Sequence, residues 1–159
     1  MRKPSQWIVA VAVLALPAGS GAVVSRFGQQ LIVQAGISGP EEGDQFGLTL
    51  AVGDFDDDGY PDLAIGAPQE DFIDVLNSGA VSVHYGGPGG LGTRIDGFTQ
   101  GSGQVPDELA VADQFGLSLA AGDFDGDGFD DLAIGAWDAV GGVVQAGSVT
   151  VLYGAVGGL

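Results

Sequence analysis

The sequence has no cysteine and few basic side chains. Without cysteine, the chain cannot form disulfide bonds, thiolate metal sites or a cysteine nucleophile. Four Lys and Arg residues stand against 21 Asp and Glu residues, so the formal net charge of the 159-residue chain is −17. A surface of that sign repels phosphates, so we expect no nucleic-acid partner and poor binding to anionic lipid.

Histidine is almost absent. His84 is the one histidine, and Leu152 occupies its equivalent position in the internal repeat described below, so a packing role is expected. Ser-His-Asp and zinc-dependent hydrolysis lack the residues they need. The glycines of residues 86–90 precede no helical pattern, which argues against a nucleotide-binding loop. We predict that the chain is not an enzyme.

Long apolar runs are limited to the N-terminus. Two basic residues precede the apolar segment Trp7–Leu16, which Pro17 breaks, and small residues follow up to Ala22. This order is typical of a secretory signal peptide, and the run is too short to span a bilayer as a helix. We predict a signal peptide at residues 1–22 and a protein secreted to the exterior or the cell envelope, with no membrane span after cleavage. An uncleaved anchor or a buried first strand is the alternative.

Glycine, in contrast, is abundant. It occupies 30 positions, while hydrophobic residues make up 45% of the chain, enough for a packed core. Glycine in a helix interior costs about 1 kcal/mol relative to alanine, so this composition favours short strands and tight turns. An all-β fold is predicted.

An internal repeat organises the rest of the chain. Residues 46–68 read FGLTLAVGDFDDDGYPDLAIGAP, and residues 115–137 read FGLSLAAGDFDGDGFDDLAIGAW, at an offset of 69. Residues 79–86 (GAVSVHYG) match residues 147–154 (GSVTVLYG) at an offset of 68. Two copies of one supersecondary unit are present.

Each unit divides into short strands separated by turn residues. The first unit predicts strands at residues 48–54, 63–66 and 80–85. A fourth strand is predicted at residues 96–100, leading towards the second unit, and its weaker counterpart lies at residues 30–34, ahead of the first unit. Four-stranded units repeated at this spacing are typical of β-propeller blades, of which a ring typically needs four to eight. We predict two four-stranded blades of an incomplete ring, at residues 23–95 and 96–159, with further blades in the same polypeptide or in an oligomer.

One acidic loop in each unit carries the chemistry. Residues 54–62 and 123–131 both fit D-x-D-x-D-G-x-x-D. Carboxylates at positions one, three, five and nine converge when a glycine at position six lets the backbone curl, and the carbonyl of position seven faces inward. Ca²⁺ takes six to eight such oxygen ligands, whereas Mg²⁺ demands stricter octahedral geometry. The predicted ligands of two Ca²⁺ sites are Asp54, Asp56, Asp58, Tyr60 and Asp62 in the first loop, and Asp123, Asp125, Asp127, Phe129 and Asp131 in the second.

Other interpretations of these loops fit less well. A solvated Asx turn is the simplest, but two copies at equivalent places of a repeat favour metal binding. An EF-hand requires Glu at position twelve and a following helix, and a dockerin also requires that helix. Position twelve is Ile65 or Ile134, inside a strand-like run.

Together, these motifs resemble the FG-GAP repeats of integrin α-subunit propellers and their bacterial relatives. The first unit has Phe46-Gly47 and Gly66-Ala67-Pro68, and the second has Phe115-Gly116 and Gly135-Ala136, with Trp137 in place of proline. The resemblance implies a seven-bladed propeller with the calcium loops on its lower face and ligands on its upper face.

The resemblance also assigns residues 69–78 and 138–145 to the upper face. Asp71, Asp74 and Asp138 are therefore candidate ligand-binding residues, although ordinary solvated hairpin tips are equally compatible. We predict a secreted, calcium-binding module for cell adhesion or protein interaction, whose partner is a protein or a matrix or surface ligand. Two alternatives remain: an accessory repeat region of a larger secreted phospholipase or hydrolase, and a purely structural, calcium-stabilised surface protein.

Overall fold

The structure is a computed structural model that describes residues 30–35, 38–72, 74–105, 108–138, 143 and 145–159. The signal peptide predicted at residues 1–22 lies outside this part of the chain. Every element of regular secondary structure in the described residues is a β-strand, which confirms the all-β prediction. No helix in this part has the length and apolar character that a bilayer span requires.

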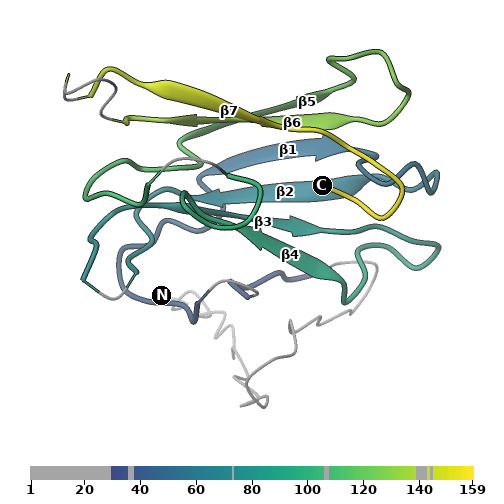
Figure 1. The fold of residues 1–159 in the computed structure, drawn as a ribbon. Coiled ribbons are helices and arrows are strands. Elements are labelled where there is room, and N and C mark those ends of the chain that lie inside the picture. Colours follow the sequence, from purple (N-terminus) through teal and green to yellow (C-terminus); the bar gives the residue numbers. More distant parts are fainter. Residues whose placement is uncertain (1–29, 36–37, 73, 106–107, 139–142, 144) are drawn as a thin grey trace, which may run out of the picture.

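The first sheet is an antiparallel meander in the order β1-β2-β3-β4 (Figure 1). Its strands are β1 (Thr49–Gly53), β2 (Asp62–Ala67), β3 (Ala80–His84) and β4 (Ile95–Phe98). Because β4 pairs with residues 81–84 of β3, the first sheet continues past the blade boundary predicted between residues 95 and 96. Hydrogen bonding to β3, rather than the spacing of the repeat, determines where this blade ends.

The second sheet repeats the first three strands. It consists of β5 (Ser118–Gly122), β6 (Asp131–Ala136) and β7 (Ser148–Leu152), in the order β5-β6-β7. Leu119 pairs with Ile134 as Leu50 pairs with Ile65, so the two sheets share one register. Four strands were predicted for this blade, and the described residues form three, because the strand predicted at residues 96–100 pairs with β3 and belongs to the first sheet as β4.

The prediction of a leading strand at residues 30–34 is wrong, because these residues form no strand. Their side chains hold the segment instead: Gln30 donates to the Leu91 carbonyl at 2.9 Å, and Gln34 donates to the carboxylate of Glu70. The segment pairs with neither sheet of the described chain. A strand is stable only in a ladder with neighbours, and this segment has none.

The two sheets stack face to face, with β1 and β5 in contact (Figure 1). Successive side chains of a strand point to opposite faces, so each sheet presents one face to the other. The first sheet buries a row of apolar residues there, each at most 9% exposed: Ala51, Ala64, Val81, Val83 and Tyr85. The second sheet packs Leu119, Ala121, Leu132 and Ile134 against that core. The hydrophobic core therefore lies between the blades.

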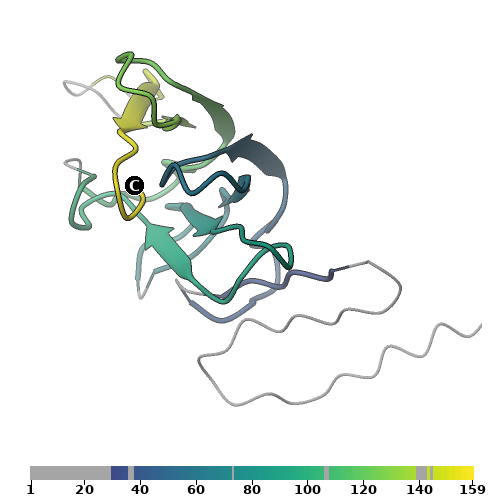
Figure 2. The ribbon, with the colours of Figure 1, turned by 90° about the vertical axis from the view of Figure 1, so that its right-hand side faces the viewer.

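The last residues of the chain also fold back onto the first blade, as the end-on view of Figure 2 shows. The N–H of Leu159 donates to the Tyr85 hydroxyl at 3.1 Å, and the Arg94 guanidinium donates to the Gly157 carbonyl. Arg94 also lies over the Tyr85 ring at 3.6 Å from its centroid, a cation–π contact. The C-terminal segment thus adds polar contacts to the apolar packing between the blades.

A matched pair of glycines tests the blade-to-blade contact. Gly79 and Gly147 precede β3 and β7 and have left-handed backbones, with φ of +84° and +80°. A Cβ atom on Gly79 would lie 2.4 Å from the Phe115 backbone, whereas the nearest atom to a Cβ on Gly147 is 3.6 Å away. Strain in the left-handed region costs about 1–2 kcal/mol, and overpacking adds about 1–3 kcal/mol.

Gly79→Ala is therefore expected to destabilise the protein by about 3 kcal/mol, and Gly147→Ala by about 1 kcal/mol. Urea unfolding of the two variants measures both losses in free energy. Equal losses would contradict the close approach of the second blade at Gly79.

Candidate metal sites

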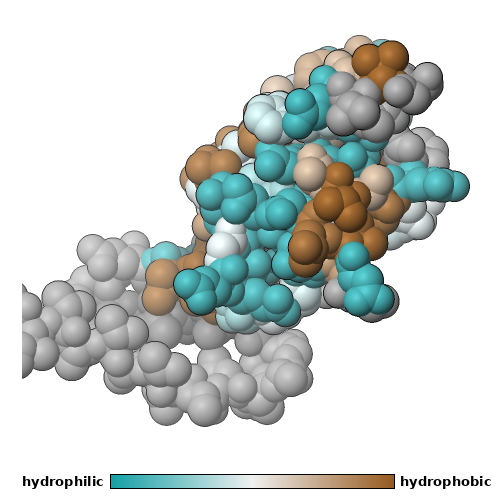
Figure 3. Space-filling view, turned by 90° about the vertical axis from the view of Figure 1, so that its left-hand side faces the viewer, coloured by the Kyte–Doolittle hydropathy of each residue, from teal (hydrophilic) through white to brown (hydrophobic). Residues whose placement is uncertain are grey.

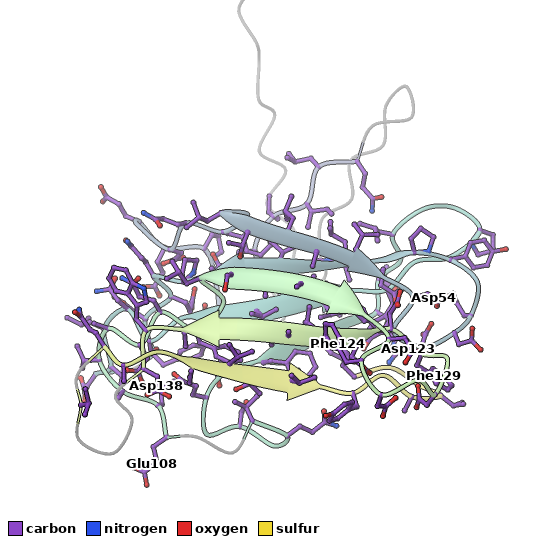
Figure 4. The ribbon with its side chains drawn as sticks, turned by 90° about the horizontal axis from the view of Figure 1, so that it is seen from above. Asp54, Glu108, Asp123, Phe124, Phe129 and Asp138 are labelled. Carbon is purple, nitrogen blue, oxygen red and sulfur yellow. The ribbon has the colours of Figure 1, made fainter. Side chains whose placement is uncertain are left out.

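Both acidic loops join the first strand of a sheet to the second, at one end of the molecule. The first loop lies between β1 and β2, and the second between β5 and β6. Figure 4 shows Asp54, Asp123 and Phe129 together at that end, and Asp138 at the opposite end.

Three carboxylates converge in each loop. One oxygen from each of Asp54, Asp56 and Asp58 lies within 4.8 Å of the others, and the equivalent set is Asp123, Asp125 and Asp127. The structure therefore brings together the residues of positions one, three and five in both loops. Like charges at such a separation repel by about 4 kcal/mol at an effective dielectric constant of about 20.

The pKa of Asp125 in the second loop is raised above its ordinary value. Desolvation is the first cause of this rise, and the negative charges of Asp127, Asp131 and Asp123 add to it. A bound cation would stabilise the ionised carboxylates, and the loops offer hard oxygen donors alone, as Ca²⁺ prefers.

The first loop also contains a carboxylate oxygen without a donor. Oδ1 of Asp56 is buried and has no hydrogen-bond partner among the described residues. A buried anionic oxygen without a partner costs free energy, and a divalent cation beside Asp54 and Asp58 would remove that cost. The first donor set therefore fits Ca²⁺ on its own geometry.

Backbone N–H groups hold the carboxylate of position one in place. Asp54 accepts hydrogen bonds from Asp58 and Gly59 at 3.1 and 3.0 Å. In the second loop, Asp123 accepts from Gly126 at 2.7 Å and from Gly128 at 3.2 Å. These bonds orient the carboxylate toward the inside of the curl.

The curl requires a left-handed backbone at two positions of each loop. Position six is Gly59 or Gly128, with φ of +85° and +101°, as the motif predicted. Position four is Asp57 or Gly126, with φ of +51° and +83°, a requirement that the sequence reasoning missed. Asp tolerates this conformation better than most residues, so either Asp or Gly can serve at position four.

The aspartates of position nine have a further role. The carboxylate of Asp62 accepts the N–H groups of Phe55 and Gly86, both at 2.8 Å, and Asp131 accepts those of Phe124 and Gly154 at 2.8 and 2.9 Å. Both aspartates are buried, and burial raises the pKa of Asp62 although its two backbone hydrogen bonds oppose the rise. Each thereby ties its loop to the end of the third strand.

The carboxylate oxygens of position nine keep further lone pairs, so their metal-ligand role stays a prediction. The same holds for the carbonyls of Tyr60 and Phe129. The N–H groups of these two residues donate to Asp58 at 2.9 Å and to Asp127 at 3.0 Å, which holds position seven inside the curl.

One basic side chain gives the two acidic loops different electrostatic surroundings. Nη1 of Arg94 lies 2.8 Å from Oδ2 of Asp56, and no other Lys or Arg occurs in the described residues. The guanidinium partly neutralises the first loop and competes with a cation there. The second loop has no such neighbour in the described part, so its carboxylates are the more strongly repelled set.

The two loops are also joined to each other. The N–H of Asp54 donates to Oδ2 of Asp130 at 2.9 Å, and the N–H of Asp130 donates to the Asp54 carbonyl at 3.1 Å. This pair of bonds crosses from one blade to the other. The position of the second loop is thereby set by the first.

The three candidate ligand-binding residues differ in their surroundings. Asp71 is half-buried and its carboxylate accepts the Asn77 N–H at 2.6 Å, which closes the hairpin between β2 and β3. Asp74 is exposed, whereas Asp138 is 3% exposed. Of the three, Asp74 offers the most accessible carboxylate.

A buried carboxylate that the sequence reasoning missed lies beside these residues. Glu70 is fully buried, and its carboxylate accepts hydrogen bonds from the Gln34 amide and the Ser38 hydroxyl. Desolvation raises its pKa, and the charge of Asp44 adds to the rise. Its neighbours come from a distant segment, so no local pattern could have revealed this site.

The internal repeat, the register and the loop geometry agree with the comparisons. The model of the FG-GAP repeat matches residues 46–84 and 115–152. The chain contains two FG-GAP repeats. These cover β1 to β3 of the first sheet and β5 to β7 of the second.

Similar FG-GAP regions occur in larger curated proteins. Integrin alpha-5 of Xenopus laevis is 39% identical over 103 residues, which is 64% of this chain and 9% of that protein. Phosphatidylinositol-glycan-specific phospholipase D of Rattus norvegicus is 37% identical over 120 residues, 74% of this chain and 13% of that protein. Integrin alpha-PS5 of Drosophila melanogaster is 41% identical over 96 residues, 59% of this chain and 9% of that protein. The matched region spans about a tenth of each relative.

The buried carboxyl of Glu70, which contacts Gln34 and Ser38, can be tested by the pH dependence of stability. Because the pKa of Glu70 is raised, the ionised carboxylate destabilises the folded state. The protonated side chain contributes stability below the ordinary glutamate pKa, and that contribution is lost as the pH rises. Glu70→Gln, which cannot ionise, should therefore gain stability relative to the original chain between about pH 4.5 and pH 7.5.

The control is Glu42→Gln, which removes a charge from an exposed position. Urea unfolding at both pH values, with calcium held constant, measures the difference in free energy of unfolding between each variant and the original chain. A Glu70→Gln difference that does not change with pH would show that burial leaves this carboxyl unperturbed.

Proposed function

We propose that this chain is part of a secreted, calcium-binding FG-GAP β-propeller that acts as a non-catalytic module for adhesion or protein interaction. The observation that carries the calcium assignment is the convergence of three carboxylates in each of two equivalent loops. The orphaned oxygen of Asp56 supports it independently. Export to the cell exterior or envelope rests on the signal-peptide pattern of residues 1–22.

Calcium would act here as a structural ion. The predicted ligands are the aspartates of positions one, three, five and nine and the carbonyl of position seven. When bound, the ion replaces carboxylate repulsion with attraction. Asp62 and Asp131 already tie each loop to the end of the third strand, so ion binding would stabilise three strands together.

The opposite end of the molecule suits a partner. Exposed apolar side chains occur on its loops, namely Leu76, Val111, Trp137 and Val143. Backbone hydrogen bonds from Ala112 to Leu76 and from Trp137 to Asp113 hold three of these loops together. Figure 3 shows an apolar patch bordered by hydrophilic residues on this end. Such a patch with a polar rim favours a protein or matrix ligand.

A second candidate is an accessory repeat region of a larger secreted enzyme. The similarity to phosphatidylinositol-glycan-specific phospholipase D favours it. The third candidate, a purely structural calcium-stabilised surface protein, has the same loops but no partner. The two experiments below separate the calcium role from the partner role.

Calcium binding is expected at two sites of unequal affinity. Isothermal titration should resolve a weaker site in the first loop, because Arg94 pairs with Asp56, and a tighter site in the second. Asp58→Asn should abolish the weaker site alone, and Asp127→Asn the tighter one. Chelation should lower the melting temperature by several degrees, since each lost ion removes linkage stabilisation.

Asp57→Asn is the matched control. It removes the same charge from the same loop at position four, outside the carboxylate cluster, and should leave both sites intact. If chelator leaves the melting temperature of the original chain unchanged, the calcium assignment fails.

Partner binding is expected at the loop end opposite the calcium loops. The probe is the purified chain in solid-phase binding to immobilised extracellular-matrix extract, with calcium present. Trp137→Ala and Asp74→Asn should each weaken binding about tenfold or more, while Asp57→Asn should not. No binding to the extract, in a chain that still binds calcium, would favour the purely structural alternative.

A further inference from the structure

The second blade holds the start of the acidic loop at residues 54–62. The backbone of Asp54 makes two hydrogen bonds to Asp130: its N–H donates to Oδ2 at 2.9 Å, and its carbonyl accepts the Asp130 N–H at 3.1 Å. The carbonyl of the next residue, Phe55, accepts the N–H of Ala155 at 3.3 Å. Asp130 lies in the loop between β5 and β6, and Ala155 follows β7. The backbone of loop positions one and two is therefore fixed from outside its own sheet.

The side chain of Phe55 is also placed by the second blade. Phe55 is 0% exposed and belongs to the same buried core as Leu132 and Leu159. The equivalent residue of the second loop, Phe124, is 54% exposed, although the two loops share one motif. The motif alone therefore does not bury the aromatic residue at position two. Burial of Phe55 depends on the contact between the blades.

The residue before the first loop permits this close approach. Gly53 ends β1, and a Cβ atom there would lie 3.0 Å from Cβ of Asp130 and 3.2 Å from Cβ of Ala121. At the equivalent Gly122, the nearest atom would be 3.6 Å away, on the ring of Phe124. Asp130 thus lies directly against the end of the strand that leads into the first loop.

Asp130 occupies position eight of its own loop, where the motif specifies no side chain. The equivalent residue of the first loop is Pro61, which has neither a carboxylate nor a backbone N–H. Both loops nevertheless bring together the carboxylates of positions one, three and five, and Asp130 is not a member of either cluster. The second loop therefore does not need Asp130 for its own curl, whereas the first loop is bonded to it.

We propose that Asp130 is a positioning residue for the calcium site of the first loop, so that residues of both blades build this site. The inference rests on the proposed calcium role and adds the source of the geometry of the first site. Asp54 is the predicted ligand at position one, and the two bonds to Asp130 fix the backbone from which its carboxylate extends. Groups that orient a metal ligand contribute to affinity without contacting the ion.

The same contact links calcium in the first loop to the packing of the blades. Where docking of the second blade strengthens calcium binding at the first loop, calcium there strengthens docking of the second blade by the same factor. The N–H of Ala155 is a reporter of this link, because it donates to Phe55 and lies outside both acidic loops. Calcium in the first loop is therefore expected to protect that N–H from hydrogen exchange.

Two substitutions at Asp130 separate the hydrogen bond from the charge. Asp130→Asn removes the charge but keeps an oxygen that can accept the Asp54 N–H, whereas Asp130→Ala removes both. Isothermal titration with calcium chloride in an Asp127→Asn background measures the first site alone. There, Asp130→Ala should bind calcium about two- to tenfold more weakly than Asp130→Asn, the change that loss of one hydrogen bond gives.

The second site is the internal control. In an Asp58→Asn background, which leaves the second site alone, Asp130→Asn and Asp130→Ala should bind calcium equally, because Pro61 shows that position eight needs no carboxylate. Equal affinities of the two variants at the first site would overturn the inference and leave the proposed function standing, and so would a loss confined to the second site. An original chain that binds no calcium would overturn both.

Amide hydrogen exchange followed by NMR adds a readout that a role of Asp130 within its own loop would not change. In the original full chain, calcium should slow exchange of the Ala155 N–H about twofold or more. Asp58→Asn should remove this effect, and Asp57→Asn, the matched control, should keep it. No slowing in the original chain, or the same slowing in Asp58→Asn, would contradict the link between the first site and the second blade.

Discussion

The contact between the two blades is the interaction on which the rest of the structure depends. A short antiparallel sheet exposes two faces, and each blade here carries apolar side chains on both. Burial of a valine or leucine side chain stabilises a fold by about 1.5–3 kcal/mol, and Val81, Val83, Leu132 and Ile134 are all buried between the sheets or beside them. Without that contact, neither three nor four short strands would have a core.

The same contact positions the acidic loops. The strands of the two sheets pair in equivalent registers, and β1 and β5 run in the same direction. The turns that follow β1 and β5 therefore lie at the same end of the molecule. Asp54 and Asp130 then exchange two hydrogen bonds across the blades. The strongly negative loops are thus held close together by apolar packing that their own charges oppose, which is why a cation is the natural complement to them.

Many features could be predicted because they depend on local sequence. The strands β1, β2 and β3 follow from alternating or apolar runs between turn residues, and the convergence of Asp54, Asp56 and Asp58 follows from their spacing before Gly59. The segment at residues 30–34 has a similar apolar pattern but forms no strand. A ladder requires a neighbour, and no local pattern can say whether one is present.

By itself, the sequence determined the all-β class, the two repeats and the acidic loops, because alternation, glycine turns and carboxylate spacing act within a few residues. Only the tertiary structure decided that Val81 is buried and Val149 is open, and that Arg94 pairs with Asp56 across 38 positions of chain. It also decided that Glu70 lies in a buried site with Gln34 and Ser38. The physical reason is that burial and ion pairing depend on which blade lies against which face, and identical residues in two repeats meet different neighbours.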